Sequence, residues 1–449
     1  MLHLNLWSNE LTTSWSRRKS MTKGRWKVIA CVALVLAMVM SACASDDTTG
    51  TTQPGETTTS AAVTPIKIGI PLALTGPIAY QADEMRNAYN LYLDQHGGKL
   101  GGIPVELLFE DTEADPNMVI SKTRKLITND QVHFLGGGAL ALESLAMIDV
   151  AVENNIAYVT PMSSADDLTQ RNLKPIFART NMTSSQPNLY FGQWAAEQGY
   201  KKVAIVAQDY AYGWESAGGF QYGFEQSGGE VVQKLYVPLD NSDITPFVRQ
   251  IDESVDAVYA ILIGSFVPQF VKAYQEFGLR DTIPLIGGPD MADEDALKAM
   301  GDEEVGLVIV HEYAASIPAA QQFVTDYEAA FGAIPSYWAE STYSASMFFD
   351  KAIAKAKVDN GLGDGEVADW IRNNPEAFID AIVAVEVPDA PRGDLKLDEY
   401  HNVIVPAYVF EVTAPDTKEI IHDFGTTTQF WTETPEEFLA HPAFSREFP

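Results

Sequence analysis

The sequence predicts an α/β protein with two lobes, each built on a doubly wound parallel sheet, and a ligand cleft between the lobes. Short β-branched or aliphatic runs alternate with helical patterns from residue 66 onward, and such near-continuous apolar strands are typical of sheets covered on both faces. The chain has 449 residues, which is longer than a single hydrophobic core usually organises. We therefore expect the strands to be divided between two sheets. Open α/β sheets bind ligands at the carboxyl ends of their strands, and two facing lobes bring those ends to one cleft.

The first element in the chain is an export signal at residues 1–42. Six basic residues precede a thirteen-residue apolar run, Val28–Met40, which is shorter than the about 20 residues that a membrane-spanning helix needs. Ser41 and Ala42 close the run, so the order is that of a signal peptide: basic region, apolar region, small residues at the cleavage site. Met21 opens a signal of its own, so both Met1 and Met21 are candidate starts.

The export signal ends at a cysteine. Met40-Ser41-Ala42-Cys43 resembles the lipobox of bacterial lipoproteins, which implies that Cys43 carries a lipid; the alternative is an ordinary signal peptide that leaves an incidental cysteine. The other cysteine, Cys31, lies inside the signal, so no intramolecular disulfide is expected in the mature chain. Residues 43–65 are rich in Thr, Ser and Gly and poor in apolar side chains, and we expect a disordered tether there.

The folded region follows residue 65. Its predicted strands are 66–72, 105–109, 132–137, 156–160, 202–207, 255–262, 284–288 and 306–311. Residues 117–130 are predicted as a helix between strands. One face of that helix carries Val119, Ile120, Thr123, Leu126 and Ile127 at helical spacing.

Four short motifs in the first part of this region occur in a fixed order. They are Ile66–Gly69, Thr75–Pro77, Gly97–Gly98, and Asp111 followed by Asp115-Pro116. With residues 342–353 and a closing strand at 401–412, they make residues 66–412 similar to the leucine/isoleucine/valine-binding protein family. These are the type I periplasmic binding proteins of ABC importers.

The resemblance implies a three-segment hinge, in which the chain crosses between the lobes near residues 182, 312 and 389. Lobe 1 then comprises residues 66–181 plus 313–388, and lobe 2 comprises 182–312 plus 389–425. Residues 426–449 form a C-terminal extension whose aromatic side chains are expected to pack back on the body.

In lobe 1 the resemblance assigns three groups of ligand-binding residues. Residues 139–142 match the loop that holds a ligand carboxylate in this family, and a helix follows it, so the amides of Ala141 and Leu142 can receive an anion. The serine that the family carries near Ala141 is missing. A second, hydroxyl-bearing loop contains Met162, Ser163 and Ser164, and the first loop contributes Tyr80 and Gln81 to the wall.

In lobe 2 the resemblance assigns an aromatic lid, Tyr212, and an acid, Asp290, that faces a ligand ammonium. Gly264 and Ser265 lie where a helix opens at a strand end. A carboxylate desolvated in a closing cleft needs a cationic or hydrogen-bonding partner, so Asp290 favours a ligand with an amine or amide.

Each of these side chains also has a purely structural interpretation. Tyr212 could be a packing residue, and Asp290 could cap a helix that begins near Met291. Ser163 and Ser164 could cap a helix through Asp166.

Several other function classes are disfavoured by the sequence. None of the seven histidines stands in an H-E-x-x-H motif, and residues 311–315, HEYAA, lack the second histidine of a zinc site. The sequence contains no G-x-S-x-G elbow and no P-loop. We therefore predict no catalytic residue, no metal and no cofactor. The net charge of −31 disfavours nucleic acid as a partner.

The predicted function is that of a monomeric, lipid-anchored solute-binding protein of an ABC importer on the outer face of a bacterial membrane. Its predicted partners are a small amino acid or amide-like ligand, the permease and ATPase subunits, and the membrane through the lipid. Two alternatives are a ligand-sensing receptor component and a lipid-anchored hydrolase. The ligand classes that fit are branched-chain or aromatic amino acids, amides, urea-like compounds and small carboxylates.

Overall fold

The computed structural model describes residues 63–241 and 243–449. The predicted signal peptide, Cys43 and all but the end of the predicted tether lie outside these residues. Within the described ranges, no helix combines the length and the apolar character that crossing a membrane requires.

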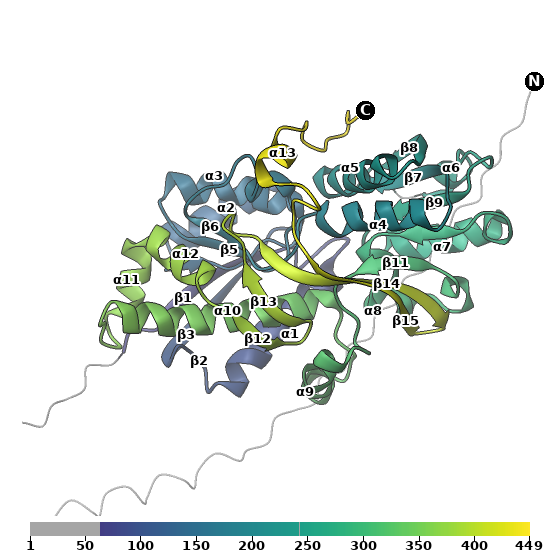
Figure 1. The fold of residues 1–449 in the computed structure, drawn as a ribbon. Coiled ribbons are helices and arrows are strands. Elements are labelled where there is room, and N and C mark those ends of the chain that lie inside the picture. Colours follow the sequence, from purple (N-terminus) through teal and green to yellow (C-terminus); the bar gives the residue numbers. More distant parts are fainter. Residues whose placement is uncertain (1–62, 242) are drawn as a thin grey trace, which may run out of the picture. The chain divides into compact units, whose positions relative to one another are not determined.

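The first lobe is built on a six-stranded sheet with the strand order β2-β3-β1-β4-β5-β6 (Figure 1). All neighbours are parallel except β2 and β3, and β1 lies between β3 and β4, which is the reversal of strand order in a doubly wound sheet. The strands are β1 (Ile66–Leu72), β2 (Lys99–Leu100), β3 (Ile103–Asp111), β4 (Phe134–Leu135), β5 (Tyr158–Thr160) and β6 (Phe177–Arg179).

Helices from two separate parts of the chain, residues 79–153 and 321–383, belong to this lobe. α1 packs on α10, and α2 packs on α3 and on β1. These helices are α1 (Ala79–Gln95), α2 (Pro116–Thr128), α3 (Ala141–Glu153), α9 (Gln321–Phe331), α10 (Tyr337–Asp359), α11 (Val367–Asn373) and α12 (Pro375–Val383). The start of α2 is determined by local sequence. The carboxylate of Asp115 accepts hydrogen bonds from the amides of Asn117 and Met118, and Pro116 occupies the first helical position.

The second lobe is built on a nine-stranded mixed sheet with the order β12-β13-β14-β11-β10-β9-β7-β8, and β15 pairs with β14. β7 to β11 run parallel, whereas β14 is antiparallel to β11. The strands are β7 (Lys202–Gln208), β8 (Glu230–Val237), β9 (Ala257–Ile261), β10 (Leu285–Gly287), β11 (Val308–His311), β12 (Val387–Ala390), β13 (Gly393–Leu397), β14 (Val403–Ala414) and β15 (Thr417–Thr427).

The helices of the second lobe include a pair in very close contact, α4 and α5. A Cβ atom at Gly223 of α5 would lie 2.0 Å from the carbonyl oxygen of Leu189 in α4, so only glycine permits this approach. The helices are α4 (Gln186–Glu197), α5 (Ala211–Gln226), α6 (Thr245–Val248), α7 (Phe266–Glu276) and α8 (Glu294–Ala299). Short 3₁₀ turns are η1 (Asp166–Leu168), η2 (Leu279–Asp281), η3 (Pro289–Ala292), η4 (Asp302–Glu304) and η5 (Pro318–Ala320), and α13 (Pro435–Leu439) follows β15.

The predicted fold class is confirmed: the chain is α/β, with two doubly wound lobes. All eight predicted strands are present, and the helix predicted over 117–130 is α2. Of its predicted inner face, Val119, Thr123, Leu126 and Ile127 are buried and Ile120 is half-buried. The residue boundaries of the lobes at 182, 312 and 389 stay predictions.

Candidate ligand-binding site

Two of the predicted residues of the second lobe meet directly. Asp290 lies in the 3₁₀ turn η3 after strand β10, and Tyr212 lies in the first turn of α5. The hydroxyl of Tyr212 donates a hydrogen bond to Oδ2 of Asp290, and both residues are buried. Asp290 is not the cap of a helix at Met291, because α8 begins at Glu294 with Asp293 as its N-cap residue. That alternative interpretation was wrong.

The environment of Asp290 raises the pKa of its carboxyl group. Burial raises the pKa of this carboxyl to about 7, the hydrogen bonds from Tyr212 and Trp338 oppose the shift, and the charge of Asp295 adds to it. Near neutral pH both the protonated and the ionised form of this side chain are therefore accessible. A carboxyl in this state can pair with an ammonium group or donate its own proton to an acceptor.

Tyr210 is a second aromatic residue here, and sequence reasoning missed it. Its ring centroid lies 6.1 Å from that of Tyr212. Burial raises the pKa of Tyr210 well above its usual value, and the charges of Asp290, Glu215 and Glu143 add to this effect. Glu143 belongs to α3 in the first lobe, so Tyr210 lies within electrostatic reach of groups from both lobes. Its position two residues before the matched Tyr-Gly motif was the only available signal.

In the first lobe, the predicted carboxylate loop leads into α3, which begins at Ala141. The carboxylate of Glu143 accepts hydrogen bonds from the amides of Ala139 at 2.7 Å and Leu140 at 2.9 Å. Among the described residues, the amides of Ala141 and Leu142 have no hydrogen-bond acceptor. The N-terminal end of α3 thus has two donors without an acceptor in the described part of the chain, and their use as an anion site stays a prediction.

The second predicted loop of the first lobe places its serines in the interior. The hydroxyl of Ser163 is buried and has no hydrogen-bond partner within the described part of the chain. Ser164 Oγ lies 3.0 Å from Ser184 Oγ, and the carbonyl of Ser184 accepts from Ser216 Oγ at 3.2 Å. Ser216 lies one turn after Tyr212 on α5, so hydrogen bonds through Ser184 connect Ser164 with the helix that carries Tyr212.

These two serines do not cap the following turn, since the N-cap residue of η1 is Ala165 and no side chain accepts a hydrogen bond there. The capping interpretation of Ser163 and Ser164 was therefore wrong. Met162 is buried beside them, and its carbonyl accepts from Asn181 Nδ2 at 2.8 Å. The same amide group donates at 2.6 Å to the hydroxyl of Tyr337, the first residue of α10.

Tyr80 and Gln81 were predicted in the first loop, but they lie in the first turn of α1, where the lobes touch. Gln81 is buried, and its side chain donates to Oδ2 of Asp295 in the second lobe. Tyr80 is 48% exposed, which places it at the rim. Partial burial and the nearby charge of Glu84 raise the pKa of the Tyr80 hydroxyl.

Gly264 and Ser265 follow strand β9 on the second lobe. Gly264 has φ +51°, and a Cβ atom at this position would lie 2.8 Å from the carbonyl oxygen of Pro77 in the first lobe. Only glycine therefore allows this approach of the two lobes. Ser265 is exposed, and its carbonyl accepts from Gln269 at 2.9 Å. Of the predicted ligand-binding residues, two are solvent-exposed, Ser265 and Tyr80. Four others are buried: Asp290, Tyr212, Ser163 and Ser164.

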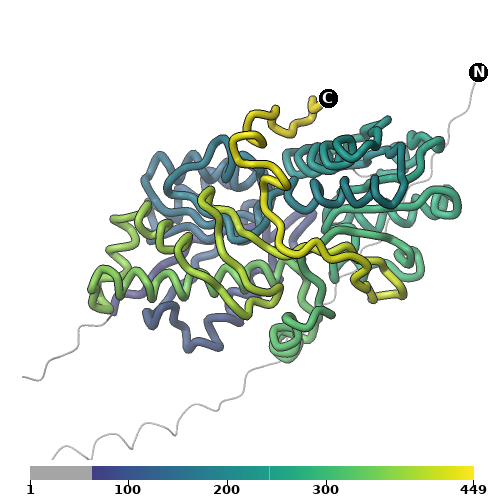
Figure 2. Tube along the Cα trace, viewed as in Figure 1, coloured from purple at the N-terminus to yellow at the C-terminus, as the bar shows by residue number. Residues whose placement is uncertain are grey.

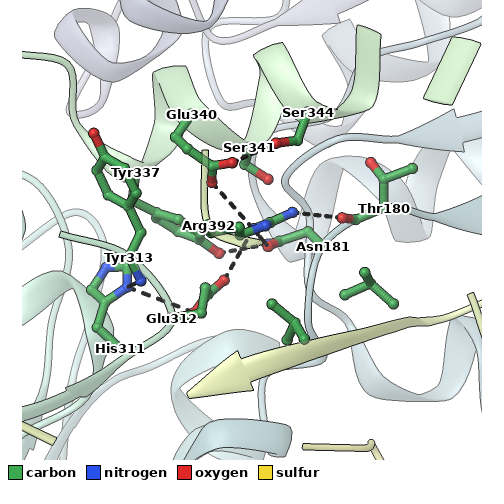
Figure 3. A network of polar contacts seen from close by, with 12 residues as sticks. Thr180, Asn181, His311, Glu312, Tyr313, Tyr337, Glu340, Ser341, Ser344 and Arg392 are labelled. Atoms are coloured by element: carbon green, nitrogen blue, oxygen red, sulfur yellow. Dashed lines mark hydrogen bonds and ion pairs between the residues drawn. The ribbon is translucent and has the colours of Figure 1, made fainter. Parts of the chain in front are cut away.

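Figure 3 shows a polar network around Arg392, whose side chain is buried. The guanidinium donates to the carbonyl of Thr180 at 2.7 Å and to Oδ1 of Asn181 at 3.2 Å. It also pairs with Glu312 at 3.3 Å and with Glu340 of α10 at 3.5 Å. Arg392 therefore lies beside the predicted crossing near residue 389 and contacts the chain beside the other two, near residues 182 and 312. No sequence pattern pointed to it.

The same network holds a buried histidine, His311, at the end of β11. Its Nδ1 accepts the backbone amide of Tyr313 at 3.1 Å, and burial lowers its pKa well below the usual value. Burial also raises the pKa of the neighbouring Glu312 to about 7, against the effect of Arg392. In residues 63–241 and 243–449, no group of three or more metal-ligating side chains is arranged to hold a metal ion.

A hollow of about 410 Å³ lies away from these residues, on the second lobe. Its lining comes from α7 and from the segment around the end of α8, and it includes Lys272 and Glu303. None of the predicted ligand-binding residues takes part in it.

Comparison with known proteins decides the family. The model of the family described as periplasmic binding protein matches residues 65–418. The chain belongs to this family of periplasmic binding proteins. Similar proteins within it include Leu/Ile/Val-binding proteins and their homologues.

This periplasmic binding protein is 26% identical over 358 residues to the Leu/Ile/Val-binding protein homolog 6 of Brucella melitensis, covering 78% of this chain and 88% of that protein. Two solved solute-binding proteins of ABC transporters from Rhodopseudomonas palustris are also similar. One, in complex with 3,4-dihydroxybenzoic acid, is 28% identical with a TM-score of 0.72 and covers 80% of this chain and 96% of its own. The other, in complex with benzoate, is 26% identical with a TM-score of 0.74 and covers 81% and 98%.

Proposed function

We propose that this periplasmic binding protein is the lipid-anchored, extracytoplasmic solute-binding component of an ABC importer. It binds a small amino acid or amide-like ligand between its lobes and delivers the ligand to a membrane permease and its ATPase. The family and the solute-binding relatives support the extracytoplasmic binding role. The lipid anchor at Cys43 rests on the sequence motif alone.

The observation that carries the ligand class is the pairing of Tyr212 with Asp290. A buried carboxyl with a pKa of about 7 is ionised more fully when a cationic or strongly donating group joins it, and a ligand ammonium or amide is such a group. The amides of Ala141 and Leu142 supply the complementary anion site on the first lobe. A zwitterionic ligand would therefore be held from both lobes.

A second ligand class is favoured by a separate observation. The two similar solute-binding proteins from Rhodopseudomonas palustris are in complex with aromatic carboxylates. Tyr210, Tyr212, Tyr337 and Trp338 are buried aromatic residues near Asp290. An aromatic carboxylate would use the amides at the start of α3 in the same way, but it would leave Asp290 without a cationic partner.

In this mechanism, closure of the two lobes around the ligand is what the permease recognises. A ligand shifts an open and closed equilibrium only by its preference for the closed state, and contacts from both lobes provide that preference. The permease would then recognise the closed, loaded form. Uptake of labelled ligand by cells distinguishes delivery to a permease from delivery to a sensor kinase. If the anchored protein supplies a transporter, cells that carry Cys43→Ala should lose uptake.

The direct test is calorimetry and thermal shift on the soluble form that begins at Thr64. Amino acids, amides and benzoates form the ligand panel, and Asp290→Asn is the test variant. Asp281→Asn is the matched control, because Asp281 is an exposed carboxylate of the same lobe. We expect Asp290→Asn to abolish binding of amine-bearing ligands while Asp281→Asn leaves it unchanged. Equal binding by both variants excludes Asp290 from the site, and turnover of any panel compound would instead favour the hydrolase.

A further inference from the structure

The chain continues past the region that the family model matches, and its end crosses the surface of the molecule. β15 ends at Thr427, and residues 428–449, here called the C-terminal strap, contain the short helix α13. Figure 2 shows this yellow segment running back beside the teal helices α4 and α5 of the second lobe.

Apolar contacts hold the strap on the second lobe. Phe430, Phe438 and Phe444 are buried and pack with Leu189 of α4 in a cluster separate from the main core. Gly218 on α5 allows the approach, because a Cβ atom there would lie 2.7 Å from Cβ of Phe444. The surface of α5 is thus shaped to receive the strap.

Polar contacts fix the strap along the same two helices. The hydroxyl of Tyr190 in α4 donates to the carbonyl of Trp431 at 3.1 Å, and the hydroxyl of Tyr222 in α5 donates to Glu433 at 2.7 Å. Near the chain end, Arg446 pairs with Asp209 at 2.8 Å. These contacts extend over the length of the strap, so its attachment to the second lobe is extensive.

The strap also binds the first lobe. Arg171 and Thr169 lie in the segment that joins β5 to β6 of the first sheet. Nη2 of Arg171 donates to the carbonyl of His441 at 2.7 Å, and Thr169 Oγ1 donates to Oε1 of Gln429 at 3.0 Å. Arg171 is itself oriented by Asp167, at 2.9 Å.

We infer that the C-terminal strap is a fourth connection between the lobes, which opposes their separation. Three predicted hinge segments join the lobes covalently, whereas the strap joins them through side chains that must part when the lobes move. The attachment to the first lobe is the smaller one, so Arg171 and His441 separate first. In the arrangement seen here the lobes touch through Gln81 and Asp295, and the strap stabilises this closed arrangement.

The consequence concerns the ligand-free protein. A charge-assisted hydrogen bond that exists only in the closed arrangement favours that arrangement, and its loss increases the ratio of open to closed molecules by roughly 5-fold. The inference goes beyond the proposed function, since it holds for any ligand.

The experiment measures the distance between the lobes without ligand. Both cysteines of the chain precede Thr64, so the soluble form is cysteine-free and accepts two spin labels at Asn90→Cys on α1 and Gln275→Cys on α7, both at exposed positions. The test variant is Arg171→Gln. The control is Arg124→Gln, which removes a similar ion pair, to Glu153 at 2.9 Å, within the first lobe.

We expect Arg171→Gln to lengthen and broaden the distance distribution, and Arg124→Gln to leave it as in the unmodified chain. Gly218→Leu, which displaces Phe444 from α5, should act in the same direction as Arg171→Gln. Circular dichroism verifies that each variant is folded. An unchanged distribution for Arg171→Gln, or an equal change for the Arg124→Gln control, overturns the inference. Because no ligand is present, this result is independent of the ligand tests above.

Discussion

Arg392 and Glu312 form an ion pair 3.3 Å long between two fully buried side chains. The guanidinium also binds the carbonyl of Thr180 and the carboxylate of Glu340, so a single side chain connects segments far apart in the sequence. A buried charge is tolerated only when it is paired and hydrogen-bonded, and Arg392 meets both conditions. The network therefore ties together segments that lie beside the predicted crossings between the lobes.

Replacement of Arg392 by Met should lower the free energy of unfolding by about 3–5 kcal/mol, because Glu312 and Glu340 lose their cationic partner inside the protein. Urea unfolding at pH 7.5 measures this change. The double variant Arg392→Met/Glu312→Gln should recover part of the loss, since it removes one of the unpaired charges.

The control for this prediction is Arg124→Met, which breaks an exposed ion pair and should change stability by no more than about 1 kcal/mol. If Arg392→Met lowers the free energy of unfolding no more than this control does, the network does not stabilise the fold.

Stability of the ligand-free protein should fall as the pH rises from about 5 to 8. Burial raises the pKa of Glu84 to about 8 and those of Asp290 and Glu312 to about 7, so the folded state binds more protons than the unfolded state across this range. The stabilisation is complete below the unfolded pKa values and is lost as the pH passes the folded ones. Melting temperatures across the range measure the slope.

Glu84→Gln should flatten this pH dependence above pH 6, because Glu84 has the highest of the three pKa values. Glu153→Gln, at an exposed site, should leave the slope unchanged. A melting temperature that rises with pH over the same range would contradict the burial effect.

Affinity for an amine-bearing ligand should increase as the pH rises through about 7. Such a ligand binds the ionised form of Asp290, so binding releases a proton below the pKa of that carboxyl. Calorimetry in buffers of different ionisation enthalpy counts the released protons. Asp290→Asn should remove both the proton release and the pH dependence, whereas pH-independent affinity in the unmodified protein would exclude an ammonium contact with Asp290.

Local patterns predicted the elements of the fold well. Asp115-Pro116 starts a helix through a side-chain cap and a restricted φ angle, both of which act within a few residues. Apolar runs such as residues 202–207 and 306–311 became strands because a sheet covered on both faces needs no alternation. No apolar run of this kind predicted that β14 would be antiparallel to β11 in the second sheet.

The interior of the site depended on distant contacts, and there sequence reasoning was incomplete. Tyr212 and Asp290 were both predicted, but their hydrogen bond spans 78 residues and could not be read from spacing. Arg392 was missed because its partners come from three segments that only the fold brings together. The contact of Arg171 with the C-terminal strap, 270 residues away, was hidden for the same reason.

Gly264→Ala should weaken ligand binding by roughly 5- to 10-fold, an effect of about 1 kcal/mol or more. The added Cβ atom would lie 2.8 Å from the carbonyl oxygen of Pro77 on the other lobe, so the closed arrangement is penalised more than the open one. Gly278→Ala is the matched control, because Gly278 has φ +72° but no atom within 4 Å of the added methyl group. Both variants carry similar backbone strain, and thermal unfolding should show similar losses. Only Gly264→Ala should reduce affinity, and equal affinities for the two variants would mean that the contact between Gly264 and Pro77 does not limit closure.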